Sequence, residues 1–158
     1  MREIKLIILA AIFAIIASIG ILNVKPANAS PAAYNMAKKY IGLHERKNTR
    51  ALRNSLGVNP RNLPWCGAFV RLVHKRIGKP IPKGYLASVN WRNVGRSVSL
   101  RNARRGDVVI LRTKVGNHVG FYAGRNKNGS VRILGGNQSN MVKVSNFLAS
   151  SIRSIRRM

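Results

Sequence analysis

Hydrophobic and polar positions divide the chain into a largely apolar leader, a helical first half and a strand-rich second half. Between Ala33 and Ile41, and again between Phe69 and Ile77, apolar residues recur at spacings of three and four. This is the period of one face of an α-helix. After Gly106 the pattern changes to short β-rich runs. Helices followed by an antiparallel sheet predict an α+β fold.

Glycine, proline and serine mark where the predicted helices begin and end. Ser30 is suited to cap a first helix that starts at Pro31, and Gly42 is suited to end it. A second long helix follows "PW", with Gly78 as its stop signal. Shorter helices are expected near residues 51–56 and 87–94. Cys66 therefore lies in or just before the first turn of a helix.

Four runs in the second half are typical of strands: "DVVILR", "HVGFYAG", "VRIL" and "MVKVSNF". Between the second and third runs, "NKNG" at residues 126–129 is a strong hairpin signal. The sheet is therefore expected to grow by short antiparallel connections.

The N-terminal segment has the pattern of an export signal. Basic residues precede an uncharged run at residues 6–24, and Ala27-Asn28-Ala29 fits a cleavage site. We expect a signal peptide at residues 1–29 and a catalytic domain at residues 30–158, in the periplasm or outside the cell. The alternative is an uncleaved signal anchor, because a span of about 20 apolar residues can cross a bilayer.

The charge of the chain is extreme. Without the leader, 26 basic and 2 acidic residues remain, because only Arg2, Lys5, Lys25 and Glu3 are removed with it. Such a domain favours polyanions. The basic residues are scattered and lack the aromatic interleaving of single-strand binders, so we expect no specific nucleic-acid site. Anionic envelope polymers or lipids are the expected partners of this surface, and we expect a monomer.

Several kinds of chemistry are disfavoured by the residues present. Three histidines and one cysteine lie far apart and form no zinc motif, and no phosphate-binding loop occurs. A two-carboxylate glycosidase would need Glu45 and Asp107, the only acids outside the leader, to be both catalytic. We expect no metal and no organic cofactor.

Thiol chemistry remains. Cys66 has no disulfide partner, and the helix start would lower the pKa of its thiol. His118, at the start of a strand, suits a general base, and the carbonyl of Asn137 in "LGGNQ" can orient the imidazole. Each has a structural alternative: a buried small hydrophobe, a strand end and a turn residue. His74 lies two helical turns from the thiol, more than about 10 Å away, and His44 is also a weaker candidate.

Four motifs in order, "PWCGAFV", "GDVVIL", "NHVGFYAG" and "ILGGNQSNMVKVS", resemble the CHAP group of cysteine, histidine-dependent amidohydrolases and peptidases. This group belongs to the wider papain-like, NlpC-type class of bacterial and phage cell-wall hydrolases. The resemblance implies a papain-like fold, with Cys66 as nucleophile, His118 as base and Asn137 as orienting residue. Many relatives carry a glutamate where this chain has Gly135, which leaves Asn137 as the only third member that we can name. Glu45 matches an acid of one subgroup, without an assigned role.

The combined expectation is an exported hydrolase that cleaves an amide bond in the peptides of peptidoglycan. Trp65 and Trp91 are predicted to line the substrate groove, with core packing as the alternative, and Asp107 to hold the loop before its strand. Two other functions stay open: a non-enzymatic cationic protein that binds envelope or nucleic acid, and a thiol deamidase or toxin acting on another amide. The bond that is cut and its biological context are not specified by the sequence.

Overall fold

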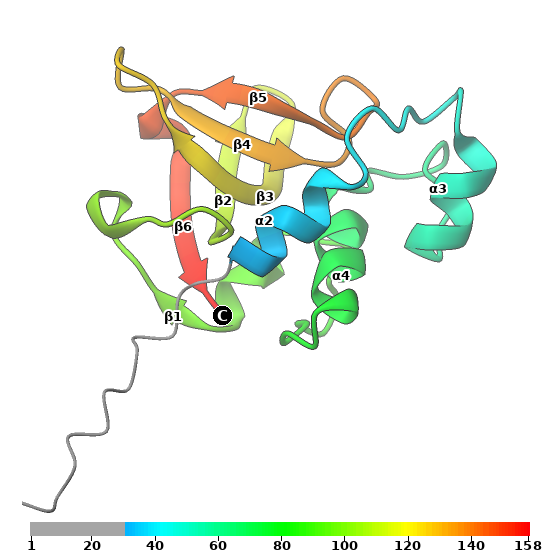
Figure 1. Ribbon diagram of the computed structural model, residues 1–158, viewed down its shortest axis with the longest axis horizontal. Helices are drawn as coiled ribbons and strands as arrows, with labels where there is room; N and C mark the ends of the chain where they lie inside the picture. The colour runs from blue at the N-terminus through cyan, green and yellow to red at the C-terminus, as the bar shows by residue number, and fades with distance from the viewer. Residues whose placement is uncertain (1–30) are drawn as a thin grey trace, which may run out of the picture.

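The computed structural model describes residues 31–158, in which helices pack on a six-stranded antiparallel sheet (Figure 1). The predicted α+β fold is therefore confirmed. The predicted signal peptide and the cap at Ser30 lie outside the described residues. Among the described residues, no helix has both the length and the apolar character needed to cross a membrane.

Three α-helices form the first half of the described chain. They are α2 (Pro31–Lys38), α3 (Thr49–Leu56) and α4 (Cys66–Arg76). The first begins at the proline that the sequence marks, and α4 begins at Cys66 itself. Helix α3 ends at Gly57, whose left-handed backbone (φ 71°) lets its N–H bond the Arg53 carbonyl. Short 3₁₀ segments follow: η1 (Ser88–Asn93), η2 (Leu100–Asn102) and η3 (Ala149–Ser151).

The sheet has the strand order β1-β6-β2-β3-β4-β5. Its strands are β1 (Arg96–Ser97), β2 (Val108–Thr113), β3 (Gly116–Arg125), β4 (Val131–Gly135), β5 (Lys143–Phe147) and β6 (Ile152–Arg157). The four predicted strands correspond to β2 to β5, and "NKNG" forms the turn between β3 and β4 as expected, with Gly129 N–H bonded to the Asn126 carbonyl at 3.0 Å. Strands β1 and β6 were not predicted, because their arginine-rich sequences lack a run of apolar residues.

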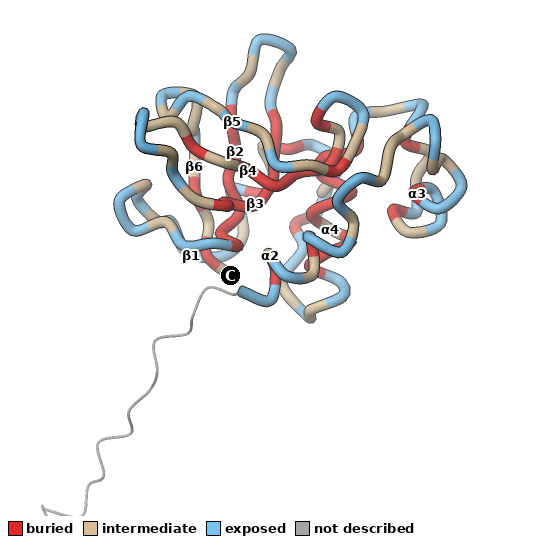
Figure 2. Tube along the Cα trace, turned by 45° about the horizontal axis from the view of Figure 1, so that its top comes forward, coloured by how far each residue is buried: buried red, intermediate tan, exposed pale blue. Residues whose placement is uncertain are grey.

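Both faces of the sheet are buried, as the alternation along β2 illustrates (Figure 2). Val108 and Ile110 face the helices, in a core with Phe69 and Phe121. Val109 and Leu111 point to the opposite face, in a second cluster covered by 3₁₀ segments and loops. Since successive strand residues face opposite sides, a strand buried on both faces needs a continuous apolar run. This arrangement fixes the ends of β2 and β3, where the site residues lie.

Candidate active site

Cys66 is the first residue of α4 and is almost fully buried. Unpaired N–H groups at the start of a helix favour a thiolate. The next residue, Gly67, lies against the loop that follows the helix: a Cβ there would come within 2.2 Å of the Tyr85 carbonyl oxygen and 2.8 Å of that of Leu86. A side chain at this position would push the loop away from the cysteine.

His118, on β3, is the histidine that the structure brings to Cys66. Its ring is buried and stacks on Phe147, with centroids 5.8 Å apart. Burial raises the pKa of the Cys66 thiol, but the hydrogen bond and charge of His118, with smaller contributions from Ser88 and the Val119 backbone, outweigh it and bring the pKa to about 7. The thiol and imidazole predicted from sequence therefore meet in one buried site.

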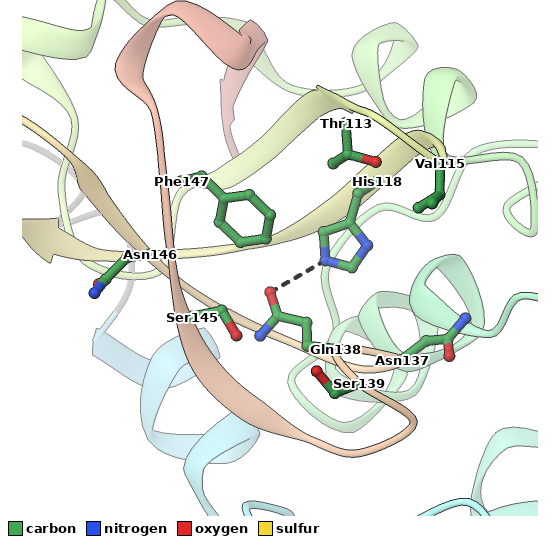
Figure 3. Close-up of a pocket in the computed structure, with 9 residues that line it drawn as sticks. All are labelled: Thr113, Val115, His118, Asn137, Gln138, Ser139, Ser145, Asn146 and Phe147. Carbon is green, nitrogen blue, oxygen red and sulfur yellow. Dashed lines mark hydrogen bonds between the residues drawn. The ribbon is translucent and has the colours of Figure 1, made fainter.

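Gln138 holds the other side of the imidazole (Figure 3). Its Oε1 lies 3.2 Å from His118 Nε2. Its Nε2 donates to the carbonyls of Ile133 at 3.2 Å and Lys143 at 2.5 Å, so the orientation of the amide is fixed. An amide oxygen can only accept, so Nε2 of His118 must carry the proton. The remaining nitrogen, Nδ1, is then free to accept the proton of the thiol.

The structure differs here from the sequence prediction, which gave the orienting role to Asn137. Asn137 is half-buried, has a left-handed backbone (φ 58°), and points away from the imidazole in Figure 3. This turn brings the next residue, Gln138, to the histidine instead. Gly135 makes room for it, since a Cβ there would lie 3.1 Å from His118 Nε2 and 3.3 Å from Gln138 Oε1. Gln138 thus occupies the space beside the position where the resemblance expected a glutamate.

Ser88 is a second site residue that the sequence prediction missed. It begins η1, is buried, and places its hydroxyl oxygen 3.3 Å from Cys66 Sγ and 3.3 Å from the Asn117 carbonyl. The hydroxyl can donate to the carbonyl while it accepts from a thiol, or rotate to donate to a thiolate. No local signal marks it, because it lies 22 positions from the cysteine in an irregular segment.

A pocket of about 300 Å³ opens over the imidazole (Figure 3). Hydroxyl, amide and apolar side chains line it together with His118: Thr113, Val115, Asn137, Gln138, Ser139, Ser145, Asn146 and Phe147. None of these eight side chains is charged. The pocket is therefore suited to a neutral, hydrogen-bonding group such as an amide.

The prediction that Trp65 and Trp91 line the substrate groove is wrong in this structure, because both side chains are 0% exposed. Trp65 Nε1 donates to Glu45 Oε2 at 3.1 Å, and Trp91 Nε1 donates to the Tyr85 carbonyl at 2.9 Å. Core packing, the alternative, describes both. The contact also gives Glu45 a role: its carboxylate satisfies the indole beside the cysteine.

The other polar candidates are structural. His74 is buried against Trp91, and its Nδ1 lies 2.7 Å from the Pro80 carbonyl oxygen. Burial, aided by Lys79 and opposed by that carbonyl, lowers the pKa of His74 to about 4, so the ring is neutral at pH 7. Asp107 accepts the Arg104 backbone N–H at 2.8 Å, which holds the loop before β2 as predicted.

Among residues 31–158, no group of three or more histidine, cysteine or acidic side chains is placed to hold a metal ion.

This chain is similar in sequence to known proteins. The sequence model of the NlpC/P60 family matches residues 57–153, which include the cysteine, the histidine and the glutamine. Murein DD-endopeptidase MepS/Murein LD-carboxypeptidase of Escherichia coli K12 is 32% identical over 80 residues, covering 49% of this chain and 41% of that protein. The chain thus matches about two fifths of the length of this curated relative.

Two solved structures are also similar. One is the P60 domain of the Mycobacterium avium subspecies paratuberculosis antigen MAP1204, with a TM-score of 0.44 and 25% identity over 58% of this chain and 63% of that one. The other is the peptidoglycan hydrolase RipB of Mycobacterium tuberculosis, with a TM-score of 0.42 and 18% identity over 83% of each chain.

Proposed function

Because the chain belongs to the NlpC/P60 family, we propose that it is an exported cysteine hydrolase that cleaves an amide bond in the peptides of peptidoglycan. The observation that carries the proposal is the buried series Cys66, His118 and Gln138, of which His118 and Gln138 line a neutral pocket. The name of the E. coli relative supports murein as the substrate class. The leader pattern at residues 1–29 supports export.

In the proposed reaction, Nδ1 of His118 takes the proton of Cys66 and the thiolate attacks the amide carbonyl. The Cys66 backbone N–H, at the start of α4, donates to the oxyanion of the tetrahedral intermediate. The imidazolium then protonates the departing amine, which leaves a thioester. Water, deprotonated by His118, attacks the thioester and releases a carboxylate and the free thiol. Gln138 accepts from His118 Nε2 and holds the ring in one orientation throughout, and no metal or organic cofactor takes part.

The proposed role of the basic surface is to hold the enzyme on anionic polymers or lipids of the envelope. In residues 31–158 only Glu45 and Asp107 oppose 26 basic side chains. Exposed charges are screened beyond about 8 Å at physiological ionic strength. High salt should therefore release the protein from intact wall more than it slows cleavage of soluble fragments. We expect the protein to act as a monomer.

The decisive experiment is Cys66→Ala on purified sacculi, with released products identified by mass spectrometry. We expect turnover to be abolished while the circular dichroism spectrum is retained, since alanine is a small apolar residue that fits the buried helix start. Wild-type products should carry a new amine and a new carboxyl end, and their masses identify the bond. They therefore separate an amidase from an endopeptidase. Turnover that survives Cys66→Ala would refute the thiol mechanism.

The basic surface also favours a second candidate, a cationic protein whose function is binding alone. Its signature would be strong retention on envelope or nucleic acid with no cleavage of sacculi by the wild type. Cleavage of a protein or free amide, in place of sacculi, would instead identify a thiol deamidase or toxin. The narrower CHAP-type assignment rests on the four sequence motifs and stays a prediction.

A further inference from the structure

A second pocket, of about 460 Å³, lies at the opposite end of β2 from the catalytic pocket. Asp107, immediately before β2, is bonded to one of its lining residues, whereas Thr113, the last residue of β2, lines the catalytic pocket. Six residues at about 3.3 Å each put the two ends roughly 20 Å apart. A ligand in the second pocket would leave the catalytic pocket open.

Arginine dominates this second pocket, which we call the arginine pocket. Its lining comes from β1, the η2 loop and β6: Arg96, Arg101, Asn102, Ala103, Arg104 and Arg157. Figure 1 shows β1 beside the end of β6 at the C-terminus. Four of these six residues are arginines and none is lysine or acidic. Guanidinium groups bind oxyanions through planar, paired N–H donors, which the point charge of a lysine lacks.

Arg157 is the fixed member of the arginine pocket. Its Nε and Nη2 bond the two oxygens of Asp107 at 2.9 and 2.8 Å, and Nη2 also bonds the Asn102 carbonyl at 2.7 Å. The side chain is only 6% exposed, and Asp107 raises the pKa of Arg157 above its ordinary value. These bonds use Nε and Nη2, so Nη1 remains to meet an anion in a preset direction.

The other three arginines carry positive charge that no acid in the pocket compensates. Arg96, Arg101 and Arg104 are exposed, and their side chains make no hydrogen bond within residues 31–158. Asp107 is already occupied by Arg157 and by the Arg104 backbone. The other described acid, Glu45, bonds Trp65. An external anion is thus the missing partner.

We propose that the arginine pocket binds the phosphate groups of an anionic polymer. A carboxylate can bind one guanidinium through both of its oxygens, as Asp107 binds Arg157. A phosphate directs its oxygens in several directions and can accept from more than one guanidinium at once. The pocket is therefore a specific attachment site within the basic surface. Binding there does not depend on the proposed hydrolase activity.

The test compares two triple variants that lose equal charge, at a fixed ionic strength near physiological. R96Q/R101Q/R104Q removes the free arginines of the pocket. K39Q/R61Q/K127Q removes three exposed cations whose side chains also lack hydrogen bonds in the described chain. Titration calorimetry with a polyphosphate chain should show at least tenfold weaker binding for the first variant and less than about threefold for the second. Cleavage of a soluble peptide should be the same in both, which separates binding from catalysis.

Two further measurements identify the ligand. Polyphosphate should shift the side-chain Nε–H resonance of Arg157 in the nitrogen–proton spectrum of the wild type, and polyglutamate of equal charge should bind more weakly. Equal losses of polyphosphate affinity in the two triple variants would overturn the proposed binding site, because they would indicate general charge attraction. Equally tight polyglutamate binding would overturn the preference for phosphate. If only phosphatidylglycerol vesicles, and not polyphosphate, respond to R96Q/R101Q/R104Q, the ligand is a lipid headgroup and the polymer assignment fails.

Discussion

The two ends of strand β2 are built from different polar chemistry. Beside its last residues, the catalytic site joins a thiol, an imidazole, a hydroxyl and an amide in one hydrogen-bonded series. Before its first residue, a buried carboxylate and guanidinium form an ion pair, with free arginines around it. The same apolar strand thus positions the hydrogen-bond network that orients His118 at one end and a charged network at the other.

This difference predicts that substitutions at one end of β2 mainly affect the stability of the protein and that substitutions at the other end mainly affect its activity. Removal of one partner of a buried ion pair leaves an uncompensated charge, which is costly to the fold. Removal of a neutral orienting group leaves a smaller penalty in stability and acts on the reaction through the geometry of the imidazole. Variants of the buried Asp107–Arg157 ion pair should therefore lower the stability of the fold more than they affect the chemistry, and variants at the catalytic end should do the reverse.

The largest effect should come from Asp107→Ala. It strands the buried Arg157 guanidinium and removes the acceptor of the Arg104 N–H, so we expect a loss of about 3–5 kcal/mol in the free energy of unfolding. Urea denaturation measures it. Asp107→Asn keeps a hydrogen-bond acceptor without the charge. Its free energy of unfolding should therefore lie between that of the wild type and that of Asp107→Ala. A loss below about 1 kcal/mol for Asp107→Ala would contradict the structural role.

At the catalytic end, Gln138→Ala should lower kcat/KM about 100-fold on a soluble peptide, because general-base catalysis of this kind contributes 10²- to 10⁴-fold and needs an oriented ring. The unfolding free energy should change by less than about 2 kcal/mol. Gln138→Glu, which keeps an acceptor for His118 Nε2, should recover part of the activity.

The matched control is Asn137→Gly, since glycine accepts the left-handed backbone that an alanine would strain. It removes the neighbouring amide and should cost less than about tenfold. A larger loss for Asn137→Gly than for Gln138→Ala would restore the sequence-based assignment of the orienting residue.

Asn137 and Gln138 are adjacent amide residues, and the sequence alone could not predict which of them orients His118. The order of motifs was enough to place Cys66 at a helix start and His118 on a strand. The choice between Asn137 and Gln138 depends on three left-handed residues in the loop, Asn137, Ser139 and Asn140, which no periodicity reveals. Backbone direction at a single residue decides which amide meets the ring.

The prediction that Trp65 and Trp91 line the substrate groove was wrong for a different reason. An indole next to a nucleophile suits either a substrate groove or the core, and the choice depends on whether its N–H finds an internal acceptor. Trp65 donates to Glu45, 20 positions away, and Trp91 donates to the Tyr85 carbonyl, 6 positions away across an irregular segment. Neither separation matches a helical or strand period. Strand β6 was likewise hidden, because three of its six residues are arginines, of which Arg157 lines the second pocket.

The pH dependence should also distinguish the two ends. The pKa of Cys66 is lowered to about 7, so the thiolate is lost as the pH falls through 7. The rate on a soluble peptide should fall about tenfold per unit below that point and level off above it. Polyphosphate binding at the arginine pocket should stay constant from about pH 5 to pH 9, because guanidinium remains charged. A flat rate profile over the same range would contradict a Cys–His pair.

The smallest expected effect is that of Ser88→Ala, and the informative quantity is how the loss in rate depends on pH. Ser88 lowers the pKa of Cys66 by a hydrogen bond, so its loss should move the midpoint of the rate profile above 7. A single hydrogen bond of about 1 kcal/mol corresponds to a loss of roughly threefold at pH 7, where about half of the wild-type thiol is ionised, and of roughly fivefold well below pH 7. Because the alanine enzyme still ionises at higher pH, the two rates should converge near pH 9, and Ser88→Thr should behave like the wild type. A deficit that stays constant across the profile would mean that Ser88 only packs beside the thiol, and the tuning of Cys66 would then belong to His118 alone.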